Sequence, residues 1–275
     1  MQMKRLILTL ALVAGSALPA FATWSVIAID AKTGQVIIAS STCVRQQGFP
    51  ERKPNGARDL MDVQAVIVPG IGVAACQAGV DNTRENQMLV YNEIKKGTLP
   101  AEIIEMLKKD PNVERRQFGI VSIPNGKTIT PQNNRAGFNG SGNSRSSLYF
   151  GGSYGDYYYQ VQGNTLLGDQ VVHQAALAFS RATGTLADHV MAAMEAADAY
   201  GGDHRCNCGN NAAPNFPCDN KTSHVAYIAV GDNDLKKGES ANPVKTLRMR
   251  YNAWVKAGSK RTDPPGPTPY KPTSH

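Results

Sequence analysis

The chain has 275 residues, of which 41% are hydrophobic, and its formal net charge is +7, with Lys4 and Arg5 carrying two of the positive charges. This length is enough for one large domain with a substantial core. No basic run is dense enough to indicate nucleic-acid binding. No segment is apolar over the ~20 residues that a membrane-spanning helix requires. We therefore expect neither a nucleic-acid partner nor a stable membrane anchor.

The first 22 residues have the three parts of a secretory signal peptide. Lys4 and Arg5 give a basic start, residues 6–13 form a short apolar core, and Ala20-Phe21-Ala22 provides a small-residue cleavage site. We predict export to the periplasm or the extracellular space, with a retained N-terminal anchor as the alternative. Cleavage after Ala22 would make Thr23 the first residue of the mature chain.

The mature chain begins with a predicted β-hairpin. Residues 23–30 alternate so that Trp24, Val26 and Ala28 share one face, and a turn at 32–34 leads to a second strand over 35–43. Residues 44–61 are polar and indicate a loop. A second strand pair is expected at 63–68 and 72–77, around Pro69-Gly70.

Two helices should follow, one from Asp81 or Asn82 to about Lys96, the other over 100–109. Residues 117–123 and 127–130 are expected to form another hairpin. Residues 131–156 are rich in Asn, Gly, Ser and Tyr and indicate an irregular surface insertion. The chain should return to a sheet at 157–161.

Helical spacing reappears at 169–182 and 186–200, and 225–230 has the pattern of a last core strand. His173 and His189 lie within these two helices, where a packed or surface role is expected and a catalytic role is the alternative. Residues 245–256 predict a short basic amphipathic helix.

The order of elements predicts an α+β fold in layers, with two antiparallel sheets between layers of helices. We expect a signal peptide over 1–22 and a single domain over 23–257, with insertions near 133–156 and 206–222. The Pro-rich tail, 258–275, is expected to be disordered.

Five cysteines in an exported chain indicate disulfides with one thiol left over. Cys43 and Cys76 each end an apolar run, so adjacent strands can bring them together. Cys206, Cys208 and Cys218 share a loop with Asp203 and His204. For this loop a bridge to Cys218 is expected, and a zinc site is the alternative. The spacing matches no common zinc pattern, so we expect no metal and no cofactor.

A threonine at the mature N-terminus holds a hydroxyl nucleophile and an α-amine base on one residue. The unperturbed pKa of that amine is ~7.7–8.0, so the amine is partly neutral near pH 7 and can accept the hydroxyl proton. The chain contains none of the common serine-hydrolase, metalloprotease or nucleotide-binding motifs. The N-terminal threonine is therefore the only coherent enzyme hypothesis.

Several phrases occur in a recognisable order. They are Thr-Trp-Ser-Val-Ile-Ala at 23–28, Gly-Val-Ala-Ala-Cys-Gln-Ala at 72–78, Arg-Gln-Phe-Gly-Ile-Val at 116–121, Gln-Gly-Asn-Thr-Leu-Leu-Gly at 162–168 and Gly-Gly-Asp-His-Arg at 201–205. With the strand at 36–40, they resemble the bacterial family catalogued as domain of unknown function 1028 over roughly 23–232. The resemblance implies the four-layer α-β-β-α sandwich of the N-terminal nucleophile hydrolase-like proteins. Ser41, where the family usually has arginine, and Cys76, where it has threonine, depart from the pattern.

We expect Thr23, Asn164 and Asp203 to be the catalytic residues. Thr23 would be the nucleophile, Asn164 would stabilise the oxyanion, and Asp203 would orient the α-ammonium group or pair with Arg205. Candidate substrate-binding residues are Arg205, which can clamp a carboxylate, Gln77 and Gly163. The structural alternatives are an edge-strand residue at 23, a turn-forming residue at 164 and an ion pair between 203 and 205.

The main functional hypothesis is an exported amidohydrolase that acts on a small amide, a peptide or a component of the cell envelope. The alternative is a non-catalytic exported protein that binds a glycan, a peptide or a peptidoglycan fragment. The tyrosines between 154 and 159 fit the alternative, because aromatic faces with polar tips suit sugar and peptide surfaces. The sequence leaves the oligomeric state open, and a homo-oligomer is one arrangement that it allows.

Overall fold

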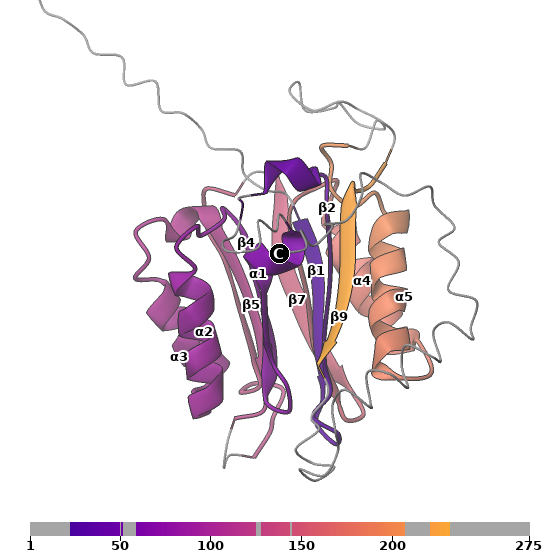
Figure 1. The fold of residues 1–275 in the computed structure, drawn as a ribbon. Coiled ribbons are helices and arrows are strands. Elements are labelled where there is room, and N and C mark those ends of the chain that lie inside the picture. Colours follow the sequence, from indigo (N-terminus) through magenta and orange to yellow (C-terminus); the bar gives the residue numbers. More distant parts are fainter. Residues whose placement is uncertain are drawn as a thin grey trace, which may run out of the picture.

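The computed structural model describes residues 23–49, 51, 59–124, 128–143, 145–206 and 221–231. The predicted signal peptide, the predicted helix at 245–256 and the Pro-rich tail lie outside these residues. The described chain forms two antiparallel sheets with helices on their outer faces (Figure 1).

The first sheet has the strand order β7-β8-β1-β2-β9 and the second the order β3-β4-β5-β6. The strands of the first sheet are β1 (Thr23–Asp30), β2 (Val36–Thr42), β7 (Ser146–Tyr154), β8 (Tyr157–Leu166) and β9 (Val225–Gly231). Those of the second are β3 (Ala65–Val68), β4 (Gly72–Ala78), β5 (Arg116–Ser122) and β6 (Arg135–Asn139). Thr23 thus begins a central strand, paired on both sides.

Helices cover the outer face of each sheet. The described helices are α1 (Leu60–Gln64), α2 (Glu85–Lys96), α3 (Pro100–Leu107), α4 (Gln170–Arg181) and α5 (Leu186–Ala199), with short 3-10 turns at Gln46–Gly48 and Val113–Arg115. α2 and α3 pack on the second sheet, whereas α4 and α5 pack on the first (Figure 1). The resulting layer order is α-β-β-α, as predicted. In the part of the chain that is described, no helix has the length and apolarity to cross a membrane.

The alternation of β1 divides its side chains between two cores. Trp24, Val26 and Ala28 pack in a cluster with apolar residues of α4 and α5. Ile27 and Ile29 face the second sheet, where they share a cluster with residues of β4 and β5. The predicted two-faced pattern of this strand is therefore confirmed, and the Thr23 and Ser25 positions share the face that points between the sheets.

Three local predictions were wrong. Residues 131–156 are not an irregular insertion, because they contain β6 and β7. The partner of β5 is β6, so the hairpin predicted with 127–130 does not form, although 125–127 themselves lie outside the described residues. The strand expected from Val63 begins only at Ala65, because Asp59 caps a short helix: its side chain accepts a hydrogen bond from the Met61 N–H.

Candidate functional site

The space between the sheets becomes polar toward the Thr23 end of β1. At the other end, the facing residues of both sheets are aliphatic. Near Thr23 they are hydroxyl and amide side chains, none of them more than 3% exposed: Thr23, Ser25, Gln64, Gln77, Gln117, Gln160, Gln162 and Asn164. Buried polar groups require hydrogen-bond partners, so a cluster of this size is held in one arrangement by its own network.

Thr23 is fixed by this network through its main chain. In the strand register it lies directly between Thr42 of β2 and Asn164 of β8. Its carbonyl oxygen accepts hydrogen bonds from Gln77 Nε2 at 3.1 Å and from Asn164 Nδ2 at 3.5 Å. One donor comes from each sheet, so the first residue of β1 is held by both.

Gln77 is the centre of the network. Its Nε2 also donates to Gln117 Oε1 at 2.7 Å, and its Oε1 accepts from Ser25 Oγ and from Gln64 Nε2, each at 2.7 Å. The side chain therefore contacts β1, β5 and α1 at once. Such a fully connected amide is costly to remove, because each lost bond leaves a buried group unpaired.

Gln117 and Asn164 extend the network toward β8. Gln117 Nε2 donates to the Gly163 carbonyl at 2.7 Å, and Gln117 Oε1 accepts from Asn164 Nδ2 at 3.2 Å. Asn164 Oδ1 is buried and has no hydrogen-bond partner among the described residues. An unpaired buried acceptor is uncommon and marks a place where a donor would bind favourably.

The backbone next to both amides is strained. Ala78, which follows Gln77, has a φ of 69°, and Thr165, which follows Asn164, has a φ of 52°. Left-handed conformations are unfavourable for residues with a Cβ and cluster at functional sites. The two residues that hold the Thr23 carbonyl are thus positioned at a cost in local conformational energy.

Gly119 makes room for a further pair of amides. A Cβ at this position would lie 1.7 Å from Gln162 Oε1 and 2.5 Å from Gln160 Nε2. Gln160 Nε2 donates to Gln162 Oε1, and Gln162 Nε2 donates across the sheets to the Ala75 carbonyl. The glycine in β5 therefore allows these β8 side chains to cross between the sheets.

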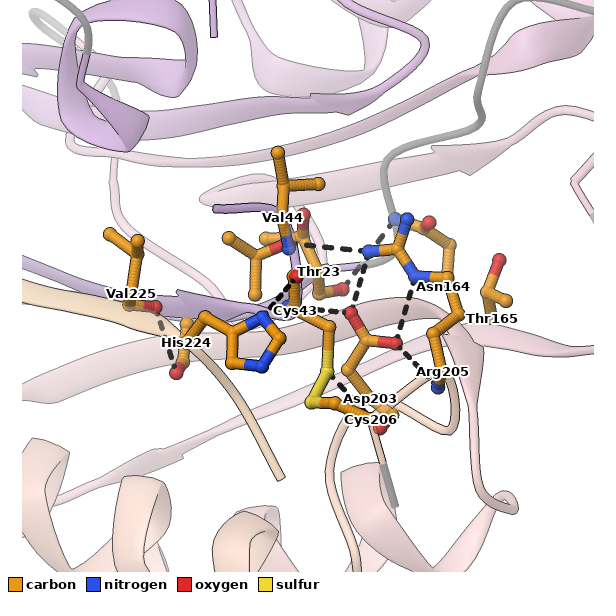
Figure 2. A network of polar contacts seen from close by, with 12 residues as sticks. Thr23, Cys43, Val44, Asn164, Thr165, Asp203, Arg205, Cys206, His224 and Val225 are labelled. Carbon is orange, nitrogen blue, oxygen red and sulfur yellow. Dashed lines mark hydrogen bonds and ion pairs between the residues drawn. A yellow bond between two sulfur atoms is a disulfide. The ribbon is translucent and has the colours of Figure 1, made fainter. Parts of the chain in front are cut away.

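Asp203 and Arg205 form a buried ion pair beside this cluster. Asp203 Oδ2 lies 2.6 Å from Arg205 Nη2, and Asp203 Oδ1 accepts from the Arg205 Nε and main-chain N–H groups at 3.0 Å. Asp203 Oδ2 also accepts from the Cys43 N–H at 2.8 Å. Because both carboxylate oxygens already have partners, the geometry favours a positioning role for Asp203. Figure 2 shows this pair grouped with Thr23 and Asn164.

A disulfide joins the same loop to the end of β2, and the expected pairing of Cys43 with Cys76 was wrong, whereas the expected bridge to Cys218 lies outside the described residues. Cys43 bonds to Cys206 (Figure 2), whereas Cys76 is free and buried. Cys43 follows β2 in the first sheet, whereas Cys76 lies in the second sheet and faces the helices α2 and α3. Burial raises the pKa of the Cys76 thiol to about 12. Cys208 and Cys218 lie outside the described residues.

His204 is held by a neighbouring cation rather than by a carboxylate. Its ring lies within hydrogen-bond distance of Arg145 Nη1, at 2.8 Å from Nδ1. Burial, and then the charge of Arg145, lower the pKa of His204, which favours the neutral imidazole. Among the described residues, no group of three or more His, Cys, Asp and Glu side chains could hold a metal ion.

The structure brings together most of the residues selected from the sequence. Thr23, Gln77 and Asn164 are directly hydrogen-bonded, the Gly163 carbonyl joins them through Gln117, and Asp203 with Arg205 lies at the adjoining loop. Arg205 Nη2 is 3.5 Å from the hydroxyl of Thr42, the cross-strand partner of Thr23.

Sequence reasoning missed Ser25, Gln64, Gln117, Gln160 and Gln162. The signal for two of them was present, because Gln160 and Gln162 alternate with Tyr159 and Val161 along one strand. Such alternation predicts a polar face. Here that face is buried against the second sheet instead of facing solvent, a placement that depends on long-range packing.

Three other singled-out positions lie away from Thr23. Ser41 is on the opposite face of β2, where its Oγ donates to the Val225 carbonyl beside a groove of about 390 Å³ near α5. His189 is buried, and its Nδ1 donates to the Phe179 carbonyl at 2.6 Å, as expected for a packed histidine. His173 is exposed beside Phe150.

Comparisons with known proteins agree with this fold. The chain is similar to the crystal structure of protein SPO2555 from Silicibacter pomeroyi, which is described as a DUF1028 protein. The match has a TM-score of 0.56 and 17% sequence identity, and it covers 85% of this chain and 86% of that chain. No curated protein matches the sequence. A family model, described as a family of unknown function (DUF1028), matches residues 23–214. The chain therefore belongs to the DUF1028 family.

Proposed function

We propose that the protein is an exported amidohydrolase whose nucleophile is Thr23, exposed by removal of residues 1–22. The observation that carries the proposal is the position of Thr23. It is the first residue of the family match and begins a central strand at the buried polar end of the inter-sheet space. The disulfide supports export, because such bonds persist mainly in oxidising compartments.

In the proposed reaction, the free α-amine of Thr23 accepts the proton of its own hydroxyl as Oγ1 attacks the substrate carbonyl carbon. The C–O bond forms, and the carbonyl π electrons move to oxygen to give a tetrahedral oxyanion. Collapse breaks the C–N bond, and the ammonium proton passes to the leaving amine. Water then attacks the resulting Thr23 ester, which releases the acid and restores the hydroxyl.

The polar network supports two parts of this reaction. The side-chain N–H groups of Gln77 and Asn164 donate to the Thr23 carbonyl and so fix the main chain of the proposed nucleophile, while a role of Asn164 in stabilising the oxyanion stays a prediction. The unpartnered Asn164 Oδ1 can accept a hydrogen bond from the newly formed α-ammonium group, since Asn164 is the cross-strand neighbour of Thr23. Removal of residues 1–22 would thus create the α-amino group that donates to Asn164 Oδ1.

Asp203 and Arg205 act indirectly in this proposal. Their ion pair and the Cys43–Cys206 disulfide hold the loop after α5 against the end of β2. The loop in turn supports the strand that pairs with Thr23. Contact between Arg205 and a substrate carboxylate remains a prediction.

Turnover of a panel of acyl-amides and peptides tests the proposal. The chain should be produced with its own signal peptide, and the variants compared should be Thr23→Ala, Thr23→Ser and an insertion of one alanine before Thr23. We expect activity in the natural chain and in Thr23→Ser, and none in the other two. Equal activity of Thr23→Ala and the natural chain would rule out this nucleophile.

A further inference from the structure

A cavity lies at the end of β1 opposite Thr23. It has a volume of about 520 Å³, within the usual range for small-ligand sites. Its lining comes from the β1–β2 turn, the β7–β8 turn, the α4–α5 connection and α5: Asp30, Lys32, Thr33, Tyr154, Gly155, Asp156, Tyr157, Thr183, Gly184 and His189. Thr23 and Asp30 are the two ends of an eight-residue strand, so this cavity is separate from the candidate catalytic site.

Aromatic rings form one wall of the cavity. The rings of Tyr154 and Tyr157 lie 5.0 and 5.2 Å from the His189 ring, measured between centroids. Tyr154 is 45% exposed, although it belongs to this ring cluster. An exposed aromatic face on a rigid hairpin is a contact surface for a flat ligand with apolar C–H groups.

His189 adds a polar side chain to the cavity lining. The side chain is 1% exposed, and its Nδ1 must donate to the Phe179 carbonyl at 2.6 Å. In the neutral ring Nε2 is then an acceptor, and no described residue donates to it. Because His189 is part of the cavity lining, this acceptor favours a ligand with a hydroxyl or N–H donor.

The charged side chains of the lining determine which ligand charge the cavity favours. The carboxylate of Asp30 is occupied within its own turn by Lys32 N–H and the Thr33 hydroxyl. The carboxylate of Asp156 has no hydrogen bond to any described residue. Burial, and then the charges of Asp30, Asp156 and Asp188, raise the pKa of Tyr157. Lys32 lines the cavity together with Asp30 and Asp156, so the polar wall carries charges of both signs and suits a neutral ligand.

We propose that this cavity binds a pyranose ring of a neutral glycan. The apolar face of the sugar packs on Tyr154, and its hydroxyls donate to His189 Nε2 and to Asp156. A neutral sugar combines these features, because it has a C–H face and several hydroxyl donors and carries no negative charge. The site does not depend on Thr23.

Saturation-transfer NMR on the full chain tests this inference. The probes are methyl β-glucopyranoside, cellobiose and chitobiose, with glucuronate as the anionic control and sorbitol as the open-chain control. We expect saturation of the ring C–H protons of at least one neutral pyranoside, and no signal from either control. Affinity should fall about tenfold in Tyr154→Ala, and Asp156→Ala should also weaken it.

Three further variants locate the site. Tyr154→Phe should retain binding, because it keeps the ring. Tyr149→Ala removes a tyrosine of similar exposure on the same strand and should have no effect. Thr23→Ala should bind as the natural chain does, which separates this inference from the proposed amidohydrolase. Absence of neutral-sugar binding, binding unchanged in Tyr154→Ala, or binding of glucuronate or sorbitol alone would overturn the proposal.

Discussion

Asn164 lies directly opposite Thr23 across the β1–β8 ladder, with its Nδ2 3.5 Å from the Thr23 carbonyl oxygen. The same side chain carries a buried Oδ1 that no described residue satisfies. The pair thus combines a strand-register constraint with an unused acceptor beside the residue that signal cleavage would expose. This relationship connects the fold to the proposed chemistry.

Asn164→Ala should reduce acylation of Thr23 by ~10²-fold, because it removes a donor that holds the Thr23 carbonyl and the acceptor proposed for the α-ammonium group. Acylation by an N-terminal-threonine-reactive probe can be followed by mass spectrometry. Asn86→Ala is a matched control, since Asn86 is also buried but donates to Asp110 on the outer side of the second sheet. An unchanged acylation rate in a folded Asn164→Ala protein would exclude this role.

Gly119→Ala should destabilise the fold by about 1–3 kcal/mol or more, because the new Cβ would overlap Gln162 Oε1. The free energy of unfolding from denaturant titration measures the effect. Gly168→Ala provides the comparison: its Cβ would meet no atom within 4 Å. Similar stability of the two variants would mean that Gln160 and Gln162 can leave the inter-sheet space without cost.

Replacing both Cys43 and Cys206 with serine should cost about 2–5 kcal/mol of stability, since their bridge closes a long loop. The loop that holds Asp203 should also become less ordered, which slows acylation of Thr23. Denaturant titration and the acylation assay report the two effects separately. Cys76→Ala, which removes a cysteine that forms no disulfide, is the control for loss of cysteine. Full stability of the double variant would show that the ion pair alone anchors the loop.

Stability should fall at alkaline pH through ionisation of Cys76. The folded pKa of its thiol is raised from 9.0 to about 12, so folding favours the protonated form. This contribution is complete below pH 9 and is lost as the pH rises from 9 toward 12, at ~1.4 kcal/mol per pH unit. Burial also raises the pKa of Tyr227 well above its usual value, so this group titrates as well. The difference between natural chain and Cys76→Ala isolates the thiol, and identical pH profiles would contradict the assignment.

Local pattern was sufficient to predict the layers but not the pairing of every strand. The alternation of Trp24, Val26 and Ala28 correctly predicted that these side chains share one face of β1. That face packs on the helices, and the other face packs on the second sheet. The sequence did not predict β6 and β7, because their Gly and Ser residues have weak strand propensity. Pairing with β5 and β8 outweighs that propensity in the folded chain.

The candidate site was predictable in part for a similar reason. Thr23, Gln77 and Asn164 could be selected from the N-terminus and the family phrases. Gln64 could not, because the sequence pattern predicted a strand at 63–68, whereas Gln64 lies in α1 and donates from there to Gln77 Oε1. The Cys43–Cys206 bond could not be predicted either, because it depends on how the loop after α5 packs against the end of β2.

The most direct test of the central claim is the mass and N-terminal sequence of the exported protein, before and after treatment with a threonine-reactive acylating probe. We predict a chain that begins at Thr23 and gains one acyl group, with no gain in Thr23→Ala. A mature chain that begins at any other residue, or a Thr23 start without acylation, would contradict the proposed mechanism.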